Sequence, residues 1–296
     1  MWFCLASASA FGAMGVLGKL AYDDGATVGT LLSARFLLAA LLFWMLVPAG
    51  ELRTLRRRDV AIGLGLGAVV YALQAGMYFT ALARIDASLL SLLVYTFPAI
   101  VAVAAVLLGR ERFDGRKAVA LCLASGGLVL VVASAGTGAL DPVGAALGLA
   151  TAVVYSGYIL VGEGIAARVA PRVLAALVAS GAAFTLTVGS AVAGQLHPER
   201  VGAAGWGLLA AMAVVATVVA MSLQFAGLRR VGPTTAAIVS NAEPVVTVLL
   251  AFVVFGELLA PLQLFGGALV LGGVLVLTGL GRPRARRRFA VVMAAE

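Results

Sequence analysis

Long apolar runs, each near 20 residues, fill most of the chain. They lie near 2–21, 29–48, 60–82, 87–108, 117–135, 143–162, 173–194, 205–226, 234–255 and 262–281, and short breaks that bear glycine, proline or charge separate them. Runs of this length, without strict alternation of apolar and polar positions, are typical of helices that cross the hydrocarbon core of a bilayer. The pattern predicts an all-α membrane protein with ten transmembrane helices.

Composition excludes an ordinary soluble protein. Hydrophobic residues make up 62% of the chain and charged residues only 11%, so the lipid bilayer is the expected solvent and partner. A formal charge of +8 invites a nucleic-acid interpretation, but the basic residues cluster in short loops. Topology explains that clustering better, and we predict no nucleic-acid partner.

Positive charge is divided unequally between alternate loops. Seventeen of the 21 lysine and arginine residues lie in one set of loops and the C-terminal segment, whereas only Arg84 and Arg200 lie in the opposite set. Because positively charged loops resist translocation, the first set is predicted to be cytoplasmic, and with it both termini. The first apolar run has no basic segment before it, so we interpret it as a transmembrane helix and not as a signal peptide.

An internal repeat divides the chain into two units. A shift of 146 places 79–132 on 225–278, so that Arg84 meets Arg230 and Pro98 meets Pro244, and a shift of 144 places Phe11 on Tyr155. We predict a first repeat over 1–136, a second over 141–282 and a basic cytoplasmic tail over 283–296. With five helices in each unit, the second copy must enter the membrane in the opposite sense. Two inverted five-helix repeats around a central cavity suit transport by alternating access.

The repeated motif resembles the EamA family of the drug/metabolite transporter superfamily. It reads FPAIVAVAAVLLGRE and then SGG in the first unit, and EPVVTVLLAFVVFGE and then LGG in the second. An arginine early in the second helix, in SARFLLAALL, adds to the likeness. The resemblance implies a multi-pass secondary transporter of the bacterial inner membrane that moves amino acids, other metabolites or drugs, often outward. It does not specify a substrate.

Four ionisable residues lie within the apolar runs, where each needs a partner or a water-filled cavity. Lys19 and Glu163 are near helix ends and can reach the interface by snorkelling. Arg35 is either a structural salt bridge or helix-end anchor, or a contact for a substrate carboxylate. Glu243, in the middle of its run and equivalent to Phe97, is either a cation or proton site or the partner of a buried base or free backbone group.

Polar and aromatic side chains recur at helical spacing and are expected to face the interior of the bundle. Helix packing and interfacial aromatic belts are the alternatives to a cavity lining. Proline in the middle of a helix kinks it and exposes carbonyl groups, although a purely structural kink is the simpler interpretation. The predicted cavity residues are Arg35, Tyr71, Gln74, Tyr78, Tyr95, Pro98, Tyr155, Tyr158, Gln224, Asn241, Glu243 and Pro244. Glycine-rich stretches, such as those at Gly63, Gly67, Gly126 and Gly272, are expected to be close-packing surfaces.

Nothing in the sequence favours an enzyme. The single histidine, His197, lies in a predicted outer loop, and no nucleophile–base pair or metal-ligand cluster lies at membrane depth. We therefore predict no cofactor and no metal. A channel or a non-transporting metabolite receptor is the alternative to a transporter of small molecules, and the sequence leaves proton coupling open.

Overall fold

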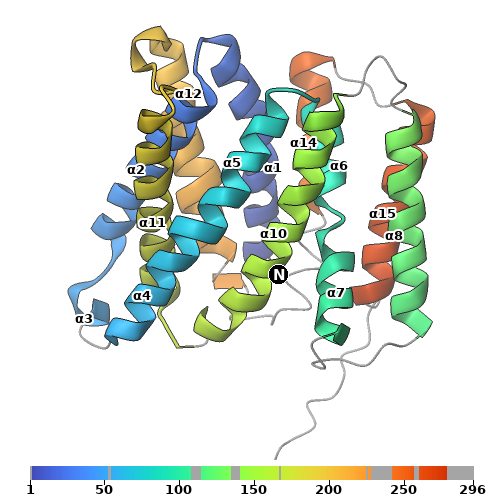
Figure 1. Ribbon diagram of the computed structural model, residues 1–296, viewed down its shortest axis with the longest axis horizontal. Coiled ribbons are helices and arrows are strands. Elements are labelled where there is room, and N and C mark those ends of the chain that lie inside the picture. Colours follow the sequence, from blue (N-terminus) through green and yellow to red (C-terminus); the bar gives the residue numbers. More distant parts are fainter. Residues whose placement is uncertain are drawn as a thin grey trace, which may run out of the picture.

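The computed structural model describes residues 2–52, 55–107, 115–134, 141–166, 168–224, 226–227, 242–256 and 260–278. Regular structure in these segments is entirely helical, and the long helices lie side by side (Figure 1). Six helices in this part of the chain are long and apolar enough to cross a membrane, namely Trp2–Asp23, Val28–Leu46, Arg57–Leu82, Pro142–Ile159, Pro171–Val192 and Ala203–Gln224. The prediction of an all-α membrane protein is confirmed.

Helix bounds follow the apolar runs closely. The first half contains α1 (Trp2–Asp23), α2 (Val28–Leu46), α3 (Ala49–Leu52), α4 (Arg57–Gly65), the π-helical turn η1 (Leu66–Tyr71), α5 (Ala72–Leu82), α6 (Ala87–Val94), α7 (Phe97–Leu107) and α8 (Gly115–Ser134). The second contains α10 (Pro142–Ala166), α11 (Pro171–Val192), η2 (Pro198–Arg200), α12 (Ala203–Ala213), the π-helical turn η3 (Val214–Val219), α14 (Ala242–Phe255) and α15 (Pro261–Thr278). Of the run predicted at 234–255, residues 234–241 lie outside the described segments.

The run predicted at 87–108 is two helices, α6 and α7, separated by a turn at Tyr95 and Thr96. Pro98 has no N–H with which to bond the carbonyl group of Val94, so the α-helical ladder cannot pass through this point. The Thr96 hydroxyl donates to the carbonyl oxygen of Leu93 at 2.8 Å and satisfies one acceptor of the ending helix. The run predicted to be one helix kinked at this proline is therefore two helices joined by a turn.

Packing partners in the two halves correspond to one another. Helix α1 packs against α14 and against α12 with η3, while α10 packs against α7 and α6 and against α5 with η1. Helices α2 and α11 pair with each other, and α8 and α15 form a pair at one edge of the molecule (Figure 1). When the whole spans Arg57–Leu82 and Ala203–Gln224 are taken as counterparts, each membrane-spanning segment thus has the same neighbours as its equivalent in the sequence repeat.

Atomic contacts repeat in the same way. On α10, the Ser156 hydroxyl donates to the carbonyl oxygen of Phe97 at 3.1 Å. Gly12 and Glu243 are the equivalent residues under the sequence shifts, and a Cβ at Gly12 would lie 3.0 Å from the Glu243 carbonyl oxygen. The backbone of α1 therefore approaches α14 closely at the position where α10 bonds to α7.

Ion pairs and loop hydrogen bonds gather several helix ends at one end of the bundle. Lys19, near the end of α1, pairs with Asp86 before α6 at 3.1 Å. Arg84, after α5, pairs with Asp141 before α10 at 2.9 Å. Asp24, after α1, accepts from the backbone N–H of Gly205 at the start of α12 at 2.6 Å. The last residues of α1 and α5 and the first residues of α6, α10 and α12 therefore share this end.

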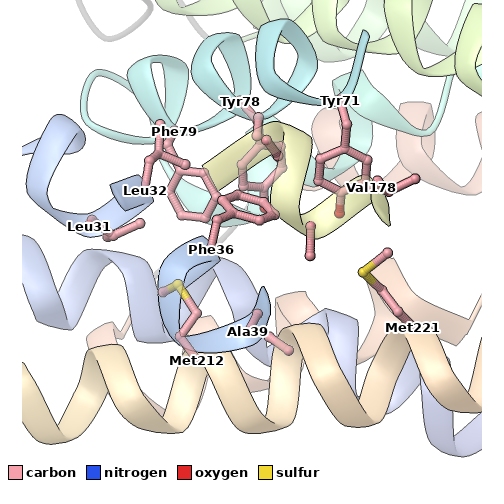
Figure 2. Packing of buried hydrophobic residues seen from close by; sticks show 14 of the residues in the cluster. Leu31, Leu32, Phe36, Ala39, Tyr71, Tyr78, Phe79, Val178, Met212 and Met221 are labelled. Carbon is pink, nitrogen blue, oxygen red and sulfur yellow. The ribbon is translucent and has the colours of Figure 1, made fainter. Parts of the chain in front are cut away.

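The buried core lies between α2, α5, α11 and α12 (Figure 2). Phe36 and Phe79 are almost inaccessible to solvent and pack with Met212 and Leu31. Gly63 and Gly67 face α11 closely, as predicted. At Gly126 and Gly272 themselves, a Cβ would meet nothing within 4 Å. The neighbouring Gly127 makes the close contact instead, against the backbone of Gly266 on α15.

Candidate functional site

Arg35 is a buried cation held by a π-helical turn. Its side chain is 1% exposed, and Nε donates to the Thr217 hydroxyl at 2.7 Å. A terminal nitrogen donates to the carbonyl oxygen of Ala216 at 3.3 Å. Both acceptors belong to η3, where the wider helical turn interrupts the regular hydrogen-bond ladder. The guanidinium also lies 4.9 Å from the ring centre of Phe36 and 5.3 Å from that of Phe79, which is favourable cation–π geometry.

No carboxylate of the described residues forms an ion pair with Arg35. The predicted alternative of a structural salt bridge therefore finds no support in this part of the chain. Burying a charge without an opposite charge is costly even when hydrogen bonds satisfy its N–H groups. The positive charge of Arg35 is therefore balanced by hydrogen bonds and ring contacts, without a carboxylate of the described residues.

Glu243 is a half-buried carboxylate at the second position of α14, not in the middle of a described helix. Its Oε2 accepts from the Tyr95 hydroxyl at 3.1 Å. Thr247, one turn later, donates to the carbonyl oxygens of Gly12 and Glu243 at 3.1 Å each and fixes α14 against α1. The carboxylate therefore projects from a braced helix start toward the turn between α6 and α7.

A continuous series of aromatic rings connects the Arg35 region with the Glu243 region. Neighbouring rings meet edge to face or stack, with centroids 4.9 to 5.9 Å apart. In order, the rings are those of Phe36, Tyr71, Tyr158, Tyr155, Phe97 and Tyr95. They come from α2, η1, α10, α7 and the turn before α7, so both repeats contribute. We call this set the aromatic chain.

The predicted cavity residues divide into three groups. Arg35, Tyr71, Tyr95, Tyr155, Tyr158 and Glu243 are brought together as described, and Tyr78 is buried beside them against Phe79. Gln74 and Gln224 are partly buried, and the Ser7 hydroxyl donates to the Gln224 side-chain oxygen at 3.2 Å. Asn241 lies outside the described residues, as do the side chains of Pro98, Pro244 and Glu163.

Several contributors to this region were not predicted from the sequence. Phe36 and Phe97 complete the aromatic chain, and Thr217 holds the guanidinium. Their positions in the sequence could have indicated both phenylalanines, because Phe36 follows Arg35 directly and Phe97 is the repeat equivalent of Glu243. Thr217 is a lone hydroxyl in an apolar run, which by itself does not distinguish it from a packing residue.

Two cavities in the described part of the molecule lie away from the tyrosines. The larger, of about 500 Å³, and a neighbour of about 180 Å³ are lined by α5 and α11, with contributions from η1, α10 and α2. The tyrosine rings contact one another between their helices. The aromatic chain is therefore a packed series of rings in the described part of the structure.

Comparison with known protein families identifies one family that matches this chain. The family described as "EamA-like transporter family" matches residues 1–133 and again residues 142–279. The two matches together span most of the chain.

A curated relative and a solved structure extend the comparison. The "Uncharacterized transporter YcbK" of Bacillus subtilis (strain 168) is 28% identical over 292 residues, which cover 94% of this chain and 91% of that protein. A solved structure described as "Crystal structure of protein" is 19% identical, covers 93% of this chain and 95% of its own, and has a TM-score of 0.61. The second likeness concerns the fold alone.

Proposed function

Because the chain belongs to the EamA-like transporter family of the drug/metabolite transporter superfamily, we propose that it exports small metabolites across the bacterial inner membrane by alternating access. Family membership itself establishes a multi-pass membrane transporter and not an enzyme. Amino acids or related compounds are the proposed substrates. Outward direction rests on the resemblance to exporters, and the charge of the loops supports a cytoplasmic location for both termini.

The proposed substrate class is inferred from the aromatic chain and the two charged residues beside it. It has a guanidinium at one end and a carboxylate at the other, with apolar and phenolic surface between them. Arg35 suits a substrate carboxylate because guanidinium binds carboxylates through two parallel hydrogen bonds. Glu243 suits an ammonium group or a proton, and the rings between them suit an apolar side chain. In this conformation the rings occupy that space, so a substrate requires α10 to move away from η1 and α7.

Contacts at one end of the bundle support the proposal of two inverted repeats. Helix α1 ends there and its counterpart α10 begins there, while the span Arg57–Leu82 ends there and its counterpart, Ala203–Gln224, begins there. Equivalent helices thus run in opposite directions. In the proposed topology this is the periplasmic end, and the Arg84–Asp141 and Lys19–Asp86 pairs help to close it. Hydrogen bonds from Arg84 and from the Gly144 N–H hold the pKa of Asp141 below its usual value.

Counterflow in liposomes tests the transporter proposal. Purified protein in vesicles loaded with a single amino acid is expected to drive uptake of the labelled compound against its gradient, and the initial rate should saturate with concentration. Screening the amino acids one at a time identifies the substrate. Linear, non-saturating flux would indicate a channel instead, and binding without flux would indicate a receptor.

Cysteine labelling tests the inverted topology. In a variant without Cys4 and Cys122, Ala83→Cys is expected to react with a membrane-impermeant maleimide in intact cells, because position 83 is exposed next to Arg84. Arg230→Cys is expected to react only after permeabilisation. Arg200→Cys is the control for the side of position 83. Labelling of positions 83 and 230 from the same side would exclude inverted repeats.

A further inference from the structure

Helix α11 packs closely against α4 and η1 and diverges from α5, which continues the same segment (Figure 1). At the closest approach, which we call the vertex, glycines bring two backbones into direct contact: a Cβ at Gly67 would collide with the carbonyl oxygen of Val178, and one at Gly181 with that of Leu64. Toward the ends of α5 and α11 the helices separate. The cavity of about 500 Å³ occupies the space between them.

This groove continues along the pair to the end of the bundle. The larger cavity and the smaller one share Gly76, Thr80, Thr185 and Leu186. The groove is open on its outer side, since Val69 is 65% exposed and Leu73 is 53% exposed on its rim. These residues lie within predicted membrane spans, so the groove faces the hydrocarbon of the bilayer and not water.

Polarity changes along the groove. Near the vertex the walls are apolar and include Ala68, Val69 and Leu73. Toward the end of α11 they include Thr80, Ser190 and Gln195. An amphipathic molecule with an apolar tail toward the membrane centre and a polar head at the interface matches this gradient.

The dimensions match one leaflet. From Ala68 to Thr80 the helix advances about 18 Å at 1.5 Å per residue, while half of the hydrocarbon core is about 15 Å thick. The vertex at Gly67 and Gly181 thus closes the groove near the membrane centre. Thr80 and Gln195 then lie at the depth of the head groups.

We propose that this groove is a binding site for one acyl chain of a phospholipid from the leaflet that adjoins the ends of α5 and α11. The chain lies between the two helices, and the glycerol region meets the hydroxyl groups of Thr80 and Ser190 and the amide of Gln195. Bound there, a lipid holds α5 apart from α11 without entering the aromatic chain. The site is separate from the proposed substrate site and does not depend on what is transported.

Gly76 provides a direct test because it lines both cavities and a Cβ there meets nothing within 4 Å. The Gly76→Phe variant should therefore fill the groove without disturbing the protein. Gly207→Phe is the matched control, since Gly207 also lies within a helix, is exposed and has no neighbour within 4 Å of its Cβ. Equal melting temperatures of the two variants and the parent in detergent confirm that both fold.

The probe is a phosphatidylethanolamine that carries a photoreactive diazirine on one acyl chain, added to vesicles of phosphatidylethanolamine that contain the full chain. We expect crosslinks to concentrate on peptides 68–80 and 185–195. Gly76→Phe should lower the yield of crosslinks about tenfold, because losing the burial of about two acyl-chain methylene groups costs roughly that factor in binding. Gly207→Phe should leave the yield unchanged. Crosslinks spread evenly over all lipid-facing helices, or unchanged by Gly76→Phe, would overturn the site.

Discussion

Glutamine at position 243 is expected to lower the rate of counterflow at least tenfold and to remove its dependence on pH. The substitution keeps the size of the side chain and an oxygen that accepts from the Tyr95 hydroxyl, so the packing of α14 should persist. It removes the charge and the capacity to carry a proton. Hydrogen bonds to charged groups are worth about 1.5–3 kcal/mol, and losing one to a substrate ammonium group therefore corresponds to roughly 10–100-fold in transport.

Tyr95→Phe is the matched control for Glu243→Gln. It deletes the hydroxyl that donates to Glu243 and leaves the carboxylate in place, so the pH dependence should remain. The rate should fall only severalfold, because the lost hydrogen bond is worth about 1 kcal/mol. Rates measured from pH 5 to pH 9 in the same liposomes separate the two variants. If Glu243→Gln transports at the parent rate with the parent pH profile, Glu243 is neither a cation site nor a proton site.

The transmembrane helices were predictable because a single physical requirement, satisfaction of backbone groups in lipid, determines their length. The predicted run at 173–194 is α11 over Pro171–Val192, and the run at 205–226 is a helix over Ala203–Gln224. A kink at Pro98 was predictable for the same reason, since a missing N–H is a local property of the chain.

The connections between helices were not predictable from the pattern. Arg35 is 182 residues from Thr217 in the sequence, and no periodicity relates the two. The π-helical turns η1 and η3 shift the faces of their helices, so a strict 3.6-residue stripe misplaces the residues beyond them. Gly126 and Gly127 are adjacent and chemically identical, and only the orientation of α8 against α15 decides which one packs.

The predicted central cavity illustrates a related limit. Helical spacing places Tyr71, Tyr155 and Tyr158 on inward faces, and they do meet one another. Spacing cannot indicate whether inward rings line a space or fill it. The rings contact one another, two described voids open between α5 and α11, and the central cavity stays a prediction.

Methionine at position 35 is expected to lower transport about 10–100-fold while leaving the protein at least as stable as the parent. A guanidinium that is buried without a paired carboxylate in the described structure carries a desolvation cost, and apolar replacement of such buried charges is often neutral or stabilising. Methionine has a similar length and adapts to the space between Phe36 and Phe79. The substrate carboxylate, however, would lose a charge-assisted hydrogen bond worth about 1.5–3 kcal/mol, which corresponds to roughly 10–100-fold in counterflow.

Arg35→Lys separates charge from geometry at the same position. Lysine keeps the positive charge but lacks the planar fork that bonds Thr217 and the Ala216 carbonyl oxygen together. It should therefore retain partial transport with weaker substrate affinity, and it should melt at a lower temperature than Arg35→Met. Counterflow kinetics and melting curves in one detergent give both readouts. A sharp fall in the melting temperature of Arg35→Met, with transport lost in proportion, would mean instead that Arg35 serves only to fasten α2 to η3.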